Sequence, residues 1–130
     1  MKMMLELIKN ILEELSTRCS EYIKCCILFR GDGLIVQTII PFIKEVDDRI
    51  IAAMTTSMLS STARLCEELS IGEPSTILVD GTSGKVVVKH VKRMDDNDIY
   101  IGILTTARAN LGLLLVELDR TVEKLRRVLE

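Results

Sequence analysis

The spacing of apolar residues along the chain alternates between the repeat of a helix and the short runs of a strand. Stripes that recur every three or four positions predict three amphipathic helices. Short, nearly continuous apolar runs rich in Ile, Val and Leu predict five β-strands. The helices are expected at 3–16, from Asp47 or Asp48 to about Leu69, and at 110–129. The strands are expected at 22–29, 34–40, 76–80, 86–91 and 99–105.

The first and fifth predicted strands, 22–29 and 99–105, are apolar on both faces, which is typical of strands in the middle of a sheet. Turns are expected at Asp32-Gly33, at 81–84 and over the polar run 92–98. These features predict an α+β fold with a five-stranded, mostly antiparallel sheet in the order 2-1-5-4-3. We expect the first and last helices on one face of the sheet and the long middle helix on the other.

The middle helix carries more apolar and small residues than a helix with one buried side needs. Its stretch 52–63 contains no charged residue, whereas a helix with one wet side ordinarily places Lys or Glu there. Two buried sides are therefore predicted. One apolar face consists of Ile51, Met54, Met58, Leu65 and Leu69. A neighbouring flank of mostly small residues consists of Ala52, Thr56, Leu59 and Ala63.

The third predicted strand lies at the edge of this sheet. Its segment 76–79 carries neither charge nor proline, so nothing in the sequence blocks pairing with another strand. Association through this edge and the middle helix is therefore predicted, and a self-matching edge favours a two-fold homodimer. The alternative is that loops of the same chain cover both surfaces.

Composition narrows the functional classes. A length of 130 residues with 48% hydrophobic content predicts one domain over 1–130, with an aliphatic core because aromatic residues are 3%. The net charge is −2, and positive and negative residues are interleaved along the chain. Both features argue against a nucleic-acid partner. Every apolar run is too short for direct membrane insertion. The four cysteines form no recognisable disulfide framework, which is typical of a soluble, cytoplasmic protein.

Residues that could carry chemistry are few. His90 is the only histidine and is expected on the surface of a strand. Cys25 and Cys26 are adjacent on a strand, so one is expected to pack on each sheet face rather than to bind zinc. The loop 81–85 departs from the phosphate-binding pattern at two positions, and the acidic run 95–98 departs from the calcium-loop pattern. We therefore expect no catalytic residue, no metal and no cofactor.

Several segments resemble the roadblock domain of dynein light chains and small-GTPase regulators. Asn110-Leu111-Gly112 is similar to the family's Asn-Leu-Gly at the start of the last helix. Asp32-Gly33-Leu34-Ile35 in the first hairpin and Glu67-Glu68-Leu69 at the end of the middle helix also match. The resemblance covers about residues 4–129, and the chain is similar to the compact, stand-alone members.

The resemblance implies a non-enzymatic homodimer in which the third strands and the middle helices of two copies meet. It also implies that the paired helices form a platform for a Ras-like small GTPase. Alternatives are a scaffold subunit that pairs with another roadblock-like chain without touching a GTPase, a small-molecule sensor, and Arg64 acting as an inserted catalytic finger. The expected dimer interface is Ala52, Thr56, Leu59, Ala63, Ile77 and Val79. The expected GTPase-binding residues are Ala53, Ser57, Ser60 and Arg64.

Overall fold

The structure is a computed structural model that describes residues 2–39 and 47–129. Its described part contains the predicted three helices and five strands, with small differences in their ends; residue 40 of the second predicted strand lies outside the described residues. The helices are α1 (Lys2–Arg18), α2 (Asp48–Glu68) and α3 (Leu111–Val128). The strands are β1 (Ile23–Arg30), β2 (Ile35–Ile39), β3 (Thr76–Asp80), β4 (Gly84–Met94) and β5 (Asn97–Thr106).

The five strands form one sheet in the order β2-β1-β5-β4-β3, which confirms the predicted order and the α+β fold. Every neighbouring pair is antiparallel. The central pair, β1 and β5, joins the two halves of the chain, with Leu28 opposite Ile101 and both side chains fully buried. Strands that are apolar on both faces lie in the centre because only there do both faces lose contact with water.

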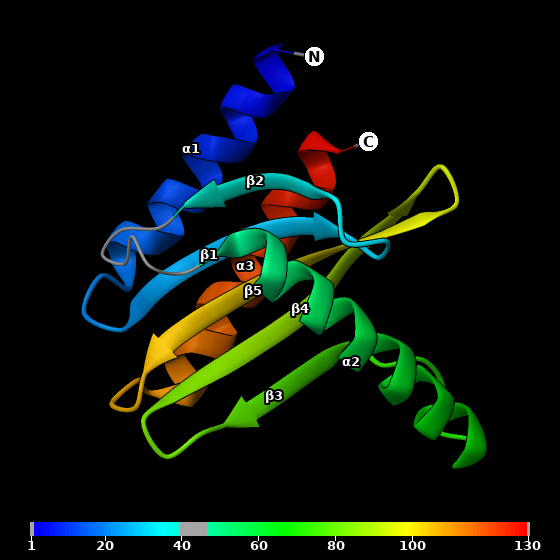
Figure 1. The fold of residues 1–130 in the computed structure, drawn as a ribbon. Coiled ribbons are helices and arrows are strands. Elements are labelled where there is room, and N and C mark those ends of the chain that lie inside the picture. Colours follow the sequence, from blue (N-terminus) through cyan, green and yellow to red (C-terminus); the bar gives the residue numbers. More distant parts are fainter. Residues whose placement is uncertain (1, 40–46, 130) are drawn as a thin grey trace.

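The helices cover the two faces of the sheet unequally (Figure 1). α1 and α3 pack side by side on one face and enclose the larger core, in which Leu12, Leu118 and Leu125 are completely buried. α2 alone lies on the other face, over a smaller cluster. Cys26 belongs to the first core and Cys25 to the second, as the alternation of side chains along a strand requires.

The hairpin between β4 and β5 differs from the expectation of a long polar turn over 92–98. Both strands continue into that segment, and only Asp95 and Asp96 separate Met94 from its pairing partner Asn97. Both aspartates have positive φ, 46° and 68°, as a two-residue turn with the twist of a hairpin requires. Asp tolerates this left-handed backbone conformation better than most residues, so the polar sequence specifies a tight turn.

Side-chain caps begin the two later helices. The carboxylate of Asp47 accepts a hydrogen bond from the Arg49 backbone N–H at 3.0 Å. The Asn110 side-chain oxygen accepts one from the Leu113 N–H at 3.1 Å. Such caps satisfy backbone donors that have no partner within the helix. The sequence expectation of helix starts at these two places is therefore confirmed.

Replacing the cap of α3 by Asn110→Ala is expected to lower the free energy of unfolding by about 1 kcal/mol, because the Leu113 N–H loses its acceptor. The measurement is urea unfolding followed by circular dichroism. Asn10→Ala is the control, since Asn10 is exposed within α1 and its replacement removes no cap. Equal effects of the two substitutions would contradict a capping role for Asn110.

Candidate partner-binding surface on the middle helix

The inner face of α2 is built from small side chains. Ala52, Thr55 and Leu59 face the chain's own sheet, and Ala52 and Leu59 are only 1% and 7% exposed. The hydroxyl of Thr55 donates to the Ile51 carbonyl at 2.7 Å, so it is satisfied within the helix. Small and internally bonded side chains let the helix lie close to the strands without burying unpaired polar groups.

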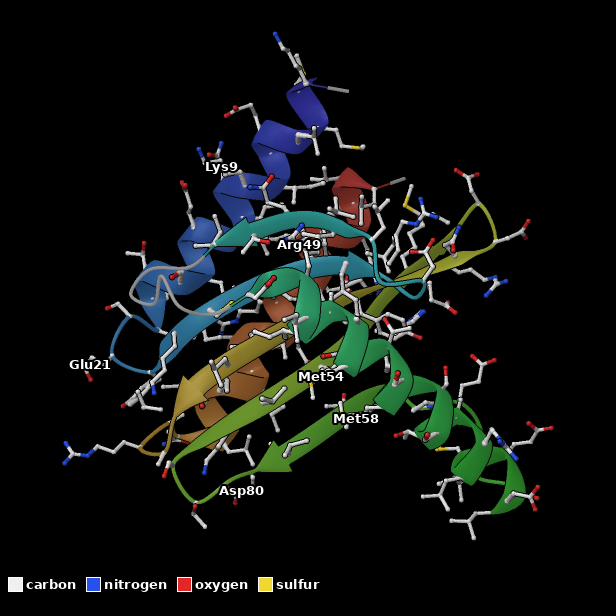
Figure 2. All side chains as sticks on the ribbon, in the orientation of Figure 1. Lys9, Glu21, Arg49, Met54, Met58 and Asp80 are labelled. Carbon is white, nitrogen blue, oxygen red and sulfur yellow. The ribbon has the colours of Figure 1, made fainter. Side chains whose placement is uncertain are left out.

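A second side of α2 is apolar and is only partly covered by the described residues, with Met58 half-buried against the cluster beneath the helix. Met54, Met58, Leu65 and Leu69 repeat along this side at helical spacing, and we call it the apolar flank. Met54 is 69% exposed and Leu65 is 58% exposed. Figure 2 places Met54 and Met58 on the side of α2 that faces β4 and β3. In Figure 1 the C-terminal half of α2 extends beyond the sheet, which explains the exposure of Leu65 and Leu69.

The edge strand β3 continues this apolar surface. It pairs only with β4 in the sheet order, so its other side presents unpaired backbone groups. Ile77 and Val79 lie opposite Val88 and Val86 of β4, and Ile77, Val86 and Val88 belong to the cluster beneath α2. Val79 is 44% exposed. The apolar flank and the unpaired edge therefore lie on the same side of the sheet and form one uncovered surface.

The outer face of α2 points away from the sheet and carries small and polar residues. All four predicted GTPase-binding residues, Ala53, Ser57, Ser60 and Arg64, lie on it and are exposed. Within residues 2–39 and 47–129, Arg64 forms no ion pair. From Ala53 to Ser60 this face carries no charged residue, and Arg64 lies toward its C-terminal end.

The remaining side of α2 borders two hollows that carry acidic groups. Thr56, Ser60 and Ala63 line a hollow of about 340 Å³ together with Asp98 and the turn after β1. A second hollow, of about 360 Å³, reaches from Ala63 to His90.

Polar contacts hold the floor of these hollows. His90 Nε2 lies 2.9 Å from Asp98 Oδ1, and an Arg93 nitrogen lies 3.2 Å from Asp98 Oδ2. The rings of His90 and Tyr100 meet in an edge-to-face arrangement, with centroids 5.3 Å apart. Burial raises the pKa of the Tyr100 hydroxyl, and the nearby Asp98 carboxylate adds to this shift. His90 is thus held in a structural contact on the strand surface where the sequence placed it.

The six predicted dimer residues fall into two groups. Ala52 and Leu59 are buried against their own sheet, although Leu59 also borders the two hollows beside α2. The small Ala52 allows the helix to approach the strands, while the larger Met54 stays exposed. The other four, Thr56, Ala63, Ile77 and Val79, keep at least part of their surface. The apolar flank, which the sequence pattern identified as a face, was not included among the predicted contacts.

The described part of the chain contains no group of three or more His, Cys, Asp or Glu side chains placed to hold a metal ion. Burial raises the pKa of the Cys26 thiol, so this cysteine stays protonated and packs as an apolar residue. No described helix has the length and apolar character needed to cross a bilayer.

Comparisons with known proteins agree on one domain type. The sequence model of the Roadblock/LC7 domain matches residues 10–105. An uncharacterized protein of Methanocaldococcus jannaschii is 27% identical over 120 residues, which are 92% of this chain and 97% of that protein. Two other uncharacterized proteins of the same organism are 26% and 23% identical over 120 residues.

Solved structures share the fold at lower sequence identity. The gliding protein MglB from Thermus thermophilus superimposes with a TM-score of 0.85 at 16% identity, over 96% of this chain and 90% of that one. An MglB described as having a tetrameric arrangement gives a TM-score of 0.86 at 16% identity, over 96% of this chain and 89% of that one. A Roadblock/LC7 domain from Streptomyces avermitilis gives 0.78 at 17% identity, over 90% and 92%.

Proposed function

Because this chain belongs to the Roadblock/LC7 domain family, we propose that it is a non-enzymatic scaffold or regulator that acts as a homodimer and binds a Ras-like small GTPase on α2. One observation carries the proposal: α2 is covered by its own chain on its inner face but leaves its apolar flank and its outer face open. The exposed apolar flank requires one partner to cover it. The exposed outer face remains available to bind a second partner.

The partner for the apolar flank is a second copy of this chain. Contiguous apolar side chains on the surface of a protein commonly mark an interface. Antiparallel pairing of β3 with β3 of the second copy is self-complementary, and a two-fold axis at that edge brings the two apolar flanks together. Met54, Leu65 and Val79 are the residues expected to be buried there. An MglB of the same fold is described as a tetrameric arrangement, so association of copies has a structural parallel.

The GTPase is proposed to bind the outer faces of the two paired helices. Ala53, Ser57 and Ser60 offer small side chains that allow a partner's backbone to approach closely, and Arg64 supplies a positive charge at the end of the row. The dimer doubles this row and forms the platform. Held on it, the switch segments of a GTPase would be biased toward one arrangement, which changes nucleotide hydrolysis or exchange by population shift.

Ser57→Arg is expected to weaken binding of the GTPase by about ten-fold or more, because a long charged side chain would stand in the middle of the small-residue platform. Purified Ras-like GTPases from the host genome, loaded with GDP or a non-hydrolysable GTP analogue, are tested against immobilised dimer.

Two controls accompany this measurement. Ser20→Arg adds the same charge at an exposed position after α1, and it is expected to bind as wild type does. The sedimentation mass of Ser57→Arg is expected to remain that of the wild type, because Ser57 lies outside the apolar flank. Unchanged GTPase binding by Ser57→Arg would count against the platform.

A further inference from the structure

A cavity of about 160 Å³ lies between the N-terminal half of α2 and the sheet. Its walls come from β1, β4, β5 and α2, and side chains such as Ile27, Phe29 and Val88 are almost fully buried. The cavity exists because two of its lining residues are small. Gly102 on the central strand β5 has no side chain, and Ala52 on α2 has only a methyl group.

We infer that this cavity is a binding site for a small, uncharged, apolar molecule. Its size is close to that of an engineered apolar cavity of about 150 Å³ that stays dry and binds benzene. Natural cores seldom keep a void of this volume, because the atoms that line it lose their packing contacts. A ligand of the size of an aromatic ring or a short branched hydrocarbon would restore those contacts. The inference does not rest on the proposed GTPase function.

The polar groups near the cavity explain why water is a poor occupant. A buried water needs two to four hydrogen-bond partners. The Thr55 hydroxyl, which borders the cavity, already donates to the Ile51 carbonyl at 2.7 Å. In the described part of the chain, the buried side-chain atoms without a hydrogen-bond partner are Arg30 Nε and Thr106 Oγ1, and neither residue lines the cavity. The lining therefore selects an apolar occupant.

The half-buried residues Ile51, Val86 and Leu104 mark where the cavity reaches the surface. A ligand can enter there without unfolding of the sheet. Because α2 covers the cavity, the ligand would contact both the helix and the strands. Its binding would therefore stabilise the packing of α2 against the sheet. Protection of the α2 amides from hydrogen exchange is then expected to rise with ligand.

Benzene is the probe for this site. At about ten times its dissociation constant it is expected to raise the midpoint of thermal unfolding by about 3–6 °C. In methyl NMR spectra, the signals of Ile27 and Val88 are expected to shift, while those of the exposed Leu65 stay in place. No rise in the midpoint, or shifts at Leu65 without shifts at Ile27, would overturn the inference.

Variants that fill the cavity give the second arm of the test. Val86→Phe extends a ring from the half-buried mouth into the cavity, and it is expected to weaken benzene binding at least ten-fold. Val116→Phe makes the same change at an exposed position on α3, and it is expected to bind benzene as wild type does. If Val86→Phe does not fold, Val88→Ile is measured instead. It adds one methylene to the wall of the cavity and is also expected to weaken benzene binding. Full benzene binding by a folded, filled variant would overturn the proposal.

A side chain from a second copy is the competing occupant. In that case the Ile27 and Val88 signals would move when the protein alone is diluted, and benzene would bind only to the dissociated chain. That result would overturn the proposal of a small-molecule site. Signals that are independent of protein concentration but respond to benzene support it.

Discussion

Met54→Glu is expected to convert the proposed dimer into a monomer, so that sedimentation equilibrium gives a mass near 14.6 kDa instead of twice that value. Met54 lies on the apolar flank and is exposed in the single chain, so the substitution leaves the chain's own core intact. In a two-fold interface each copy contributes one new carboxylate, and the two charges would be desolvated close to each other. Such an arrangement costs several kcal/mol, which corresponds to a loss of affinity of about a hundred-fold or more.

The matched control for this prediction is Met3→Glu, because Met3 is also an exposed methionine on a helix but lies on α1, away from the apolar flank. It is expected to sediment as a dimer. Two results would contradict the proposed interface. A dimer that survives Met54→Glu places the contact elsewhere, and a wild-type chain that is monomeric at all concentrations points to pairing with a different roadblock-like chain.

Leu118→Ala is expected to lower the free energy of unfolding by about 2–5 kcal/mol. Leu118 is 0% exposed and packs in the core that α1 and α3 enclose against the sheet, so its truncation removes apolar contacts and leaves a cavity. The core around it consists of strands and helices that cannot collapse onto the space without moving the sheet. Urea unfolding, followed by circular dichroism at one protein concentration, measures the change.

Leu113→Ala provides the comparison within the same helix. Leu113 is 52% exposed, and the same atoms are removed there without opening a cavity. A loss below about 1 kcal/mol is expected, and surface substitutions are commonly within that range. If the two leucines had equal effects, the packing of α3 against the sheet would have to be revised.

The sheet order could be predicted from the sequence because burial imposes a pattern on the strands that carry it. β1 and β5 are apolar on both faces, and this property alone places them together in the centre. The turn between β4 and β5 was misjudged because its tip is exposed. Where both faces of a hairpin meet water, no alternation of apolar and polar residues marks the strands, so Lys92 and Arg93 resemble a loop although they are paired residues of β4.

The candidate site was predicted in part. The absence of charge in 52–63 predicted two buried sides of α2, of which the structure of the single chain shows one, and it did not show which side faces the sheet. Size favours burying Met54 and Leu65, whereas the structure buries Ala52 and Leu59 and leaves the larger side chains outside. Hydrophobic periodicity shows which faces of a helix are the most apolar. It does not show how closely the helix must approach a strand that carries a glycine such as Gly102.

The pairing of β1 with β5 has a consequence for how the chain is made. β1 leaves the ribosome early, but its partner in the centre of the sheet is the last strand to be synthesised. Until β5 and α3 emerge, β1 can pair only with β2 and pack only against α1, and α1 has no helix beside it. Such long-range pairing is slow to form, and exposed apolar strands are prone to aggregate. Folding during synthesis must therefore await nearly the whole chain, and the nascent N-terminal half is the stage at which a chaperone would be needed.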